Sequence, residues 1–390
     1  MTIYGLNWNL TTDICTPTDA LVGTTTPAQR TAICDTAAPW QLKRCNLSDD
    51  GTPTAYHGDR CYTDTDTYAM GPAMVEIPKF YYKTTYTAPT FSFKISDVPA
   101  SGYVIHPAFT RGGATRDYIY LGAYEASAVY PDKLESKAGV EPAVRWTVEE
   151  FRTAAELRAG SVQNEWEIQD YLITCAVQYL YLVEYGHFNS QTVLSNGITN
   201  STSPSYVEGA SLTGHTSSLQ VGSGSTDLGN ASGEVLHTFD VVPESGDLTG
   251  YAMSYRGIEN FYGNTWTMID GINIEADYKP YVADHNFVSD TFTGSYSRIG
   301  ASLVFPSNGG YISDLWVPTN TYGFFPAVAE GSGSTYLCDY YWSDVGNQCV
   351  AIGGCWDHDY EAWAGMFACS LQPAAFYHYF YGTRLMYIGT

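Results

Sequence analysis

The segment NEWEIQDYLITCAVQYLYLVEY, residues 164–185, carries the strongest structural signal in the chain. Its apolar residues recur at intervals of three and four positions, which is the spacing of one face of an α-helix. This stripe consists of Trp166, Ile168, Leu172, Ile173, Ala176, Leu180 and Val183. Because Asn164 and Glu167 are close to a capping-box arrangement, we expect the helix to begin at Asn164 and to bury its apolar stripe in a core.

A second helix is predicted just before this one, because Thr147 is followed three residues later by Glu150 in a capping box. Strand-type runs precede both helices, in AMVEIPKFYYKTTY (73–86) and TFSFKISDV (90–98). After the helices, residues 251–390 show short segments punctuated by Gly, Asn and Pro, which are typical of strands and loops. The order of strands, two helices and a loop-rich β region predicts an α+β class.

Two further regions have distinct compositions. Residues 1–70 are rich in Thr, Asp and Pro with little periodicity, which predicts an N-terminal arm or small cap. Residues from about 195 to 250 are dominated by Ser, Gly and Thr. That region is too long for a simple connection and too polar for a core, so we expect a long decorated loop with short strands.

The composition excludes several classes of function. A formal net charge of −23 argues against nucleic acid and anionic membrane surfaces as partners. No stretch approaches the roughly 18 apolar residues of a membrane span, and the opening MTIYGLNWNL has no recognisable signal peptide. Nine cysteines without a CxxC pair exclude a zinc ribbon. Free thiols are expected in a reducing compartment, and disulfides remain the alternative in an oxidising one.

Motifs for catalysis are absent from the sequence. It contains no GxSxG elbow, no cysteine-protease signature and no phosphate-binding glycine loop. The run from Trp356 to Tyr360 places Asp357, His358 and Asp359 side by side, as a divalent-metal site would. In an extended segment, however, the two carboxylates share one face and the imidazole points to the other. A solvated polar loop is therefore favoured over a metal site.

The end of the chain is unusually aromatic. In AAFYHYFYGTRL (374–385), six consecutive positions from Phe376 to Tyr381 are aromatic or imidazole. Alternation along a strand sends about half of such side chains outward, so part of the run should be exposed. Tyrosine offers a large rigid contact area with one hydroxyl, and an exposed aromatic patch usually marks a binding site. The alternative is that these rings fill a core.

Several segments resemble the variable proteins of diversity-generating retroelements and their phage tail-fibre relatives, which have a C-type lectin fold. They are VEIPKFYYK (75–83), HPAF (106–109), YIYLGAYEAS (118–127), AVQYLYLVEYGHFNSQ (176–191), YRGIENFYGNTW (255–266), DGINI (270–274), GGCWDHDYEAWAGMF (353–367), SLQPAA (370–375) and GTRL (382–385). The resemblance implies an α+β C-type lectin fold with two early helices, twisted antiparallel strands and long loop insertions. The domain would span residues 71–390, with an insertion at about 195–250 and a variable region at about 336–387.

The resemblance also implies site residues. In that family an error-prone reverse transcriptase randomises adenines, usually in codons that can never yield Trp, Met, Gln, Glu or Lys. The eligible ligand-binding positions are Tyr340, Tyr341, Ser343, Asp357, His358, Asp359, Tyr360, Ala368, Ser370, Phe376, Tyr377, His378, Tyr379 and Phe380. The expected scaffold consists of Trp342, Gly353, Gly354, Trp356, Glu361, Trp363, Ala364, Gly365, Met366, Gln372, Gly382 and Arg384. Among these, Arg384 can satisfy several buried carbonyls with its five donors.

GNTW and GTRL also resemble the formylglycine-generating enzymes of the same fold. Their terminal motif carries a catalytic Cys after the Arg, where this chain has Leu385. No enzymatic activity is therefore expected. Sugar-binding motifs of calcium-dependent lectins are not intact either, since the chain has Gln372-Pro373-Ala374 and Trp356-Asp357-His358 at the similar places.

The resemblance implies ligand or receptor recognition by a diversified surface, displayed on a virion tail fibre or a cell surface. The partner would be a protein or other surface ligand of a host or neighbouring cell, with no nucleic acid and no membrane insertion. No cofactor is expected. Structural calcium or magnesium and a homo-oligomer are left open. The alternatives are an undiversified structural tail-fibre tip, in which the aromatic run is a trimer interface, and an enzyme of the formylglycine-generating type.

Overall fold

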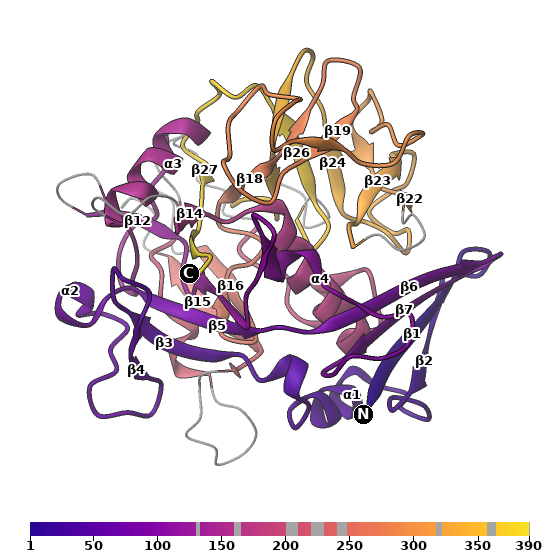
Figure 1. Ribbon diagram of the computed structural model, residues 1–390, viewed down its shortest axis with the longest axis horizontal. Helices are drawn as coiled ribbons and strands as arrows, with labels where there is room; N and C mark the ends of the chain where they lie inside the picture. Colours follow the sequence, from indigo (N-terminus) through magenta and orange to yellow (C-terminus); the bar gives the residue numbers. More distant parts are fainter. Residues whose placement is uncertain are drawn as a thin grey trace.

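The computed structural model describes residues 1–129, 133–159, 165–199, 210–219, 230–239, 248–316, 322–356 and 364–389 (Figure 1). Strands account for 35% of these described residues and helices for 16%, in several sheets and with no closed barrel among them. The predicted α+β C-type lectin fold is therefore wrong, and the chain has a β-rich fold. The main reason is that residues 1–70, which were expected to be an irregular arm, contain four short strands between Ile3 and Tyr56, whereas the strands and loops expected in residues 251–390 are present.

Helix α4 (Tyr171–Tyr185) lies at the centre of the molecule, and all fifteen of its residues are buried. Asp170 caps its N-terminus by accepting a hydrogen bond from the Ile173 N–H, and Gly186 ends it in the left-handed conformation with φ of 63°. The helix packs against α1, β1, β7 and β18. It is a core helix with no polar face, because elements on every side cover it.

The predicted start of this helix at Asn164 is wrong. Asn164 itself lies outside the described residues, and Trp166 and Ile168 belong to strand β14 (Trp166–Ile168). This strand pairs antiparallel with β28 (Leu385–Tyr387) at the end of the chain. The spacing of Trp166 and Ile168, two positions apart, is compatible with a strand and with the edge of a helical stripe. Pairing with the distant strand β28 favours the strand.

The other predicted helix is confirmed. Helix α3 (Val148–Glu156) begins after Thr147, whose side chain accepts from the Glu150 N–H while the Glu150 carboxylate accepts from the Thr147 N–H. The remaining helices are α1 (Pro27–Cys34), α2 (Thr67–Met70) and α5 (Ser190–Val193), with 3-10 turns η1 (Ala38–Trp40), η2 (Pro107–Phe109), η3 (Leu157–Ala159) and η4 (His215–Ser218). No helix in these described ranges is long and apolar enough to cross a membrane.

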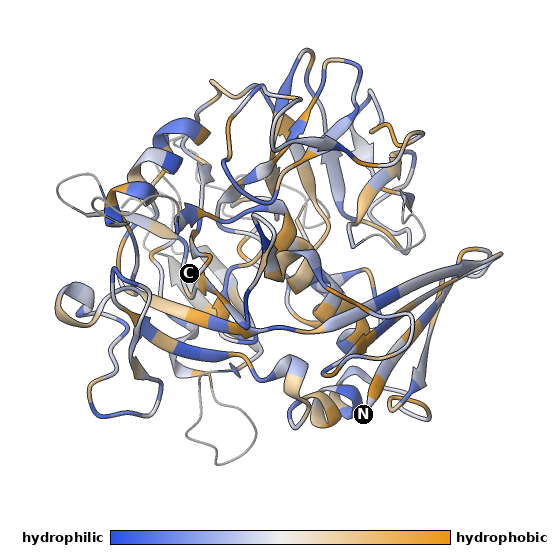
Figure 2. Ribbon diagram, viewed as in Figure 1, coloured by the Kyte–Doolittle hydropathy of each residue, from blue (hydrophilic) through white to orange (hydrophobic). Residues whose placement is uncertain are grey.

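A five-stranded antiparallel sheet covers one side of α4, in the order β2-β1-β7-β6-β8. Its strands are β1 (Ile3–Asn9), β2 (Ile14–Asp19), β6 (Tyr81–Thr87), β7 (Thr90–Ser96) and β8 (Val104–Ile105). Buried and more exposed residues alternate along most of β6 and β7, and the buried residues of β7 are mainly hydrophobic, so one face points to the core and the other to solvent (Figure 2). Residues 1–70 supply two of these strands, although they were predicted as an arm or small cap.

A six-stranded sheet in the order β14-β28-β11-β5-β3-β4 lies beside the first. Its further strands are β3 (Lys43–Leu47), β4 (Pro53–Tyr56), β5 (Ala73–Pro78) and β11 (Tyr118–Gly122). Strand β28 therefore has neighbours on both sides, β14 and β11. The last residues of the described chain are thus part of the sheet interior.

The third large sheet has eight strands, seven of them in the order β20-β19-β18-β25-β26-β24-β21, with β27 paired to β18 off this path. They are β18 (Trp266–Ile274), β19 (Pro280–Val282), β20 (Ser297–Arg298), β21 (Gly310–Tyr311), β24 (Tyr340–Trp342), β25 (Gln348–Ile352), β26 (Cys369–Gln372) and β27 (Tyr381–Gly382). Its strands form the orange and yellow part of Figure 1. This sheet carries the C-terminal segments in which ligand-binding residues were predicted.

Smaller pairings complete the fold. They join β9 (Thr110–Arg111) to β10 (Ala114–Thr115), β12 (Ala126–Val129) to β13 (Lys133–Ser136), β15 (Gly233–Phe239) to β16 (Leu248–Tyr255) and β17 (Ile258–Glu259), and β22 (Asp314–Trp316) to β23 (Phe325–Val328). The predicted insertion at about 195–250 falls partly outside the described residues. Its described part includes η4 and β15.

A buried ion pair joins α4 to the β16–β17 turn. The Arg256 guanidinium lies 2.6 Å from the Glu184 carboxylate, and both side chains are at most 1% exposed. Asp35 adds a second carboxylate at 2.8 Å, and the Tyr255 hydroxyl also donates to Glu184. Because both charges are cut off from water, each depends on the other for compensation.

We predict that Glu184→Gln, which keeps the side-chain shape but removes the charge, lowers the free energy of unfolding by about 3 kcal/mol. The exposed pair between Lys79 and Asp117 is the matched control, and Lys79→Gln should cost less than about 1 kcal/mol. Urea denaturation followed by circular dichroism measures both. Equal small losses in the two variants would contradict the assignment of Arg256 as a buried charge that needs Glu184.

Candidate functional site

The segment from Glu259 to Thr265 is fixed by two buried carboxylates. Glu125, just after β11, accepts hydrogen bonds from the Thr265 backbone N–H at 3.1 Å and from the Asn264 side-chain amide at 2.6 Å. Glu259 accepts from the Gly214 and Thr216 backbone N–H groups, each at 2.6 Å. Burial raises the pKa of both carboxyl groups, and the hydrogen bonds oppose that rise. The segment that leads into β18 is therefore held rigidly.

Arg384 ties the end of the chain to the same segment. Its guanidinium is fully buried and donates to the carbonyl oxygens of Gly122, Glu259 and Asn260 at 2.9, 2.6 and 3.0 Å. The expectation that Arg384 satisfies several buried carbonyls is confirmed. Burial lowers the pKa of Arg384 to about 10, which still leaves it charged at neutral pH. This anchor fixes β27 and β28, and with them the segment just before β27.

An aromatic pocket of about 360 Å³ opens where the starts of β18 and β27 lie side by side. Trp266 and Tyr381 are partners in a parallel pairing there, and their rings stack with centroids 6.2 Å apart. The Phe376 ring stands nearly perpendicular to Tyr381 at 5.2 Å, and Phe380 lies at 5.2 Å on another side. The pocket is lined by Trp266, Trp342, Asp344, Ser370, Gln372, Phe376, Phe380 and Tyr381. Rings thus form several of its walls.

The polar groups in the floor of this aromatic pocket are hydrogen-bonded to one another. Ser370 Oγ lies 2.9 Å from the Tyr381 hydroxyl, and the Gln372 amide donates to both oxygens at 3.0 Å. At the rim, one Asp344 carboxylate oxygen accepts from the Val345 N–H. The pocket is therefore suited to an apolar group, or to a cation that can lie over ring faces beside a carboxylate.

The structure brings some of the predicted ligand-binding residues to this pocket and leaves others elsewhere. Tyr377 is exposed, and Tyr340, Ser343, Phe376, His378, Tyr379 and Phe380 are half-buried. Tyr341, Ala368 and Ser370 are buried, and the Tyr341 hydroxyl donates to the Pro306 carbonyl. Asp357, His358, Asp359 and Tyr360 lie outside the described residues. The expectation that part of the aromatic run is exposed is confirmed by Tyr377, at 62%.

Most of the predicted scaffold residues are buried. Gly353, Gly354, Trp356, Ala364, Gly365, Met366, Gln372, Gly382 and Arg384 all have little or no exposed surface, whereas Glu361 and Trp363 lie outside the described residues. Trp342 differs, because 45% of its surface is exposed at the rim of the aromatic pocket. The sequence did not assign Trp266, Asp344 or Tyr381 to ligand binding. The pairing of β18 with β27, which joins distant segments, reveals Trp266 and Tyr381, and Asp344 joins them in the pocket lining.

Asp339 holds the segment that leads into β26. Its buried carboxylate accepts from the Phe367 N–H at 2.8 Å, and a side chain on Gly365 would collide with it at 2.3 Å. Glycine is required there because the backbone passes so close to the carboxylate. Burial raises the pKa of Asp339 from 3.8 to about 7. A charged Asp339 therefore costs stability at neutral pH.

Metal and thiol chemistry find little support near the pocket. Within the described ranges, no group of three or more His, Cys, Asp or Glu residues is placed to hold a metal ion. The suggested metal ligands Asp357, His358 and Asp359 lie outside those ranges. Cys369 is buried, and burial raises the pKa of its thiol to about 12, so the reactive thiolate is disfavoured. Cys355 is buried as well.

Comparison with known proteins gives no relative. No model of a known protein family matches the chain, and a search of curated proteins finds no match. The resemblance to retroelement variable proteins therefore stays a hypothesis drawn from the sequence.

We predict that Asp339→Asn removes a pH dependence of stability. Because folding raises this pKa, the stabilising contribution of Asp339 is full below pH about 4 and is lost as the pH rises to about 7. The wild-type unfolding free energy, relative to the variant, should fall by up to ~1.4 kcal/mol per pH unit across that range. Urea denaturation at a series of pH values measures it. Glu330→Gln, at an exposed carboxylate, should leave the pH dependence unchanged, and parallel curves for wild type and Asp339→Asn would refute the prediction.

Proposed function

We propose that this protein is a recognition protein that binds a surface ligand of a host or neighbouring cell through its aromatic pocket and the adjoining run 376–380. The observation that carries the proposal is the gathering of five aromatic side chains around one pocket, with Trp342 45% exposed at its rim. Exposed rings around a concave site supply most of the binding energy in recognition surfaces, because they bury large areas at little entropic cost.

The inserted ligand group is either apolar or a quaternary ammonium ion. Hydroxyl-rich ligands need free donors, and in the floor both N–H bonds of the Gln372 amide and one of the two hydroxyl groups, Ser370 or Tyr381, already donate internally. A cation gains from the electron-rich ring faces and from the Asp344 carboxylate at the rim. The formal charge of −23 adds a long-range attraction for cations.

The distribution of residues in the aromatic pocket also supports the part of this proposal that concerns sequence diversification of the binding surface. Phe376 and Phe380, eligible for codon randomisation by the resemblance, form walls, whereas Trp266 and Gln372 form the floor. Arg384 and the pairing of β27 with β18 hold the backbone that follows the run 376–380 in place. Side chains of the run that line the pocket can therefore be exchanged without disturbing that backbone. Display on a virion tail fibre or cell surface belongs to the same proposal. The buried, protonated thiol of Cys369 supports a non-enzymatic role.

We predict that benzyltrimethylammonium quenches tryptophan fluorescence on binding, and that Trp342→Ala and Phe380→Ala each weaken its affinity at least about tenfold, since each removes one ring of the aromatic pocket. Fluorescence titration measures the affinities. Tyr68→Ala is the matched control, because Tyr68 is 99% exposed and lies on α2, outside the pocket lining. Equal binding by all variants would overturn the role of the pocket.

The same Trp342→Ala variant separates recognition from a structural tail-fibre tip. If the aromatic face is an oligomer interface, the variant dissociates the assembly, as seen by light scattering. If it recognises a ligand, the assembly state is unchanged while binding of the probe is lost.

A genetic prediction tests diversification. We expect the neighbouring DNA to contain a reverse-transcriptase gene and a near-copy of the region that codes for residues 336–387, differing at adenines. Sequencing the flanking DNA is the measurement. Absence of both elements would assign the protein to the undiversified class while leaving ligand binding at the pocket intact.

A further inference from the structure

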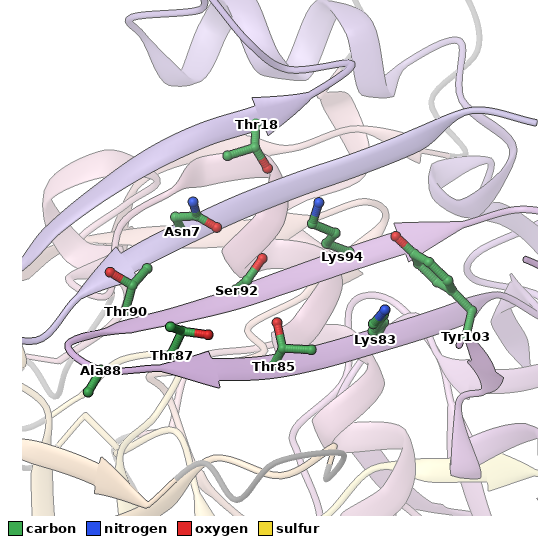
Figure 3. A pocket seen from close by; sticks show the side chains of 10 residues that line it. All are labelled: Asn7, Thr18, Lys83, Thr85, Thr87, Ala88, Thr90, Ser92, Lys94 and Tyr103. Atoms are coloured by element: carbon green, nitrogen blue, oxygen red, sulfur yellow. The ribbon is translucent and has the colours of Figure 1, made fainter. Parts of the chain in front are cut away.

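The outer face of the five-stranded sheet forms a second concave surface, on strands distinct from those that line the aromatic pocket. A hollow of about 640 Å³ lies over β2, β1, β7 and β6, and Tyr103, just before β8, is part of its lining. It is lined by Asn7, Thr18, Lys83, Thr85, Thr87, Ala88, Thr90, Ser92, Lys94 and Tyr103, whose side chains stand on the same side of the sheet (Figure 3). We call this surface the polar sheet face.

Most polar side chains on the polar sheet face have unused hydrogen-bonding capacity. The side chains of Asn7, Thr85, Thr87, Thr90 and Ser92 make no hydrogen bond to any described residue, whereas Thr18 donates to Asp19. They stand close together, because Asn7 is the cross-strand partner of Ser92, and Ser92 is the partner of Thr85. The face therefore offers a row of free hydroxyl and amide groups, in contrast to the internally bonded floor of the aromatic pocket.

Two lysines face each other across this sheet. Lys83 and Lys94 are direct partners in the antiparallel register of β6 and β7, where like charges destabilise a sheet. Lys94 lies 2.9 Å from the Asp19 carboxylate, whereas Lys83 has no carboxylate within ion-pair distance among the described residues and lies 5.8 Å from the Tyr103 ring centre. The chain has only seven lysines and a net charge of −23. Lys94 has Asp19 as its partner, so among the described residues the cation of this pair without a carboxylate partner is Lys83, and an anion beside both ammonium groups would offset its charge.

The lining also contains no Asp or Glu, although 41 of the 390 residues are acidic. An anion entering the hollow thus meets cations and hydroxyl groups, and it competes for Lys94 with the carboxylate of Asp19, which lies outside the lining. Partners directly opposed in an antiparallel pair have Cα atoms about 5 Å apart, so both ammonium groups can reach one acidic group. The remaining hydroxyl and amide groups suit a ligand that is itself rich in hydroxyls.

We propose that the polar sheet face binds an acidic polysaccharide, with one carboxylate or sulfate between Lys83 and Lys94 and neighbouring sugar hydroxyls on the row from Asn7 to Thr85. Tyr103 supplies a flat apolar surface at one end for a sugar ring. A nucleic acid does not fit, because a continuous phosphate backbone needs many cations to displace its counterions, and this face offers only two lysines, enough for one isolated acidic group. This inference is independent of the function proposed for the aromatic pocket.

Fluorescence polarisation with labelled oligogalacturonate and labelled chondroitin sulfate tests the proposal and tells carboxylate from sulfate. We expect at least one to bind, with affinity that falls as ionic strength rises, while labelled neutral dextran does not bind. Lys83→Gln combined with Lys94→Gln should weaken binding at least about tenfold. Thr85→Val combined with Ser92→Ala should weaken it through the lost hydroxyls.

Three controls keep the test specific. Lys43→Gln changes an exposed strand lysine of the six-stranded sheet and should bind like the wild type. Trp342→Ala, which disrupts the aromatic pocket, should also leave polysaccharide binding unchanged. Thermal unfolding should show that the double lysine variant is folded, since it removes a repulsion.

Binding of neither acidic polysaccharide, equal binding of dextran, or unchanged binding by the double lysine variant would each overturn the proposal. Self-association of the wild-type chain that disappears in the double lysine variant would also overturn it, because the face would then contact a second acidic copy of this chain.

Discussion

The burial of helix α4 on every side is the constraint on which the rest of the structure depends. A helix with fifteen buried residues cannot lie at an edge, so elements far apart in the sequence, such as β1, β7 and β18, must enclose it. Its few polar groups then need internal partners. Glu184 pairs with Arg256, and the Gln178 amide donates to the Met366 carbonyl at 2.7 Å. Through Met366 the helix determines where the segment before β26 lies, and therefore where the aromatic pocket forms.

Sequence patterning predicted those features that depend on nearby residues. The capping box of Thr147 and Glu150 gave α3 correctly, because both partners lie within one helical turn. The start of α4 was wrong because Trp166 and Ile168 join a strand whose partner is β28, near the end of the chain. The fold class was wrong because residues 1–70, where turn residues dominate the sequence, contribute four strands. At the candidate site, the wall residues Phe376 and Phe380 were identified from the aromatic run, and the floor residues Ser370 and Gln372 from the resemblance. Trp266 was missed, since it reaches the floor through its pairing with Tyr381, and no local pattern encodes a parallel pairing between such distant segments.

The two concave surfaces of this protein differ in how their polar groups are used. In the aromatic pocket, Ser370, Gln372 and Tyr381 bond to one another, which leaves rings and one carboxylate to meet a ligand. On the polar sheet face, hydroxyl and amide groups are free and two cations stand together. The first surface selects against hydroxyl-rich ligands and the second selects for them, because unsatisfied polar groups are costly to bury without a partner. The chain thus presents one surface suited to apolar or cationic groups and another suited to acidic, hydroxyl-rich ligands.

The position of β28 between β14 and β11 has a consequence for the order of folding. The six-stranded sheet stays open along the edge of β11 until residues 385–387 have been synthesised, because no earlier strand occupies that place. Pairing between such distant segments is slow, since loop closure must precede any gain from contacts. A nascent chain therefore exposes an unpaired apolar strand edge for most of its synthesis. Such an edge invites pairing with other chains, which makes protection by chaperones valuable during biosynthesis.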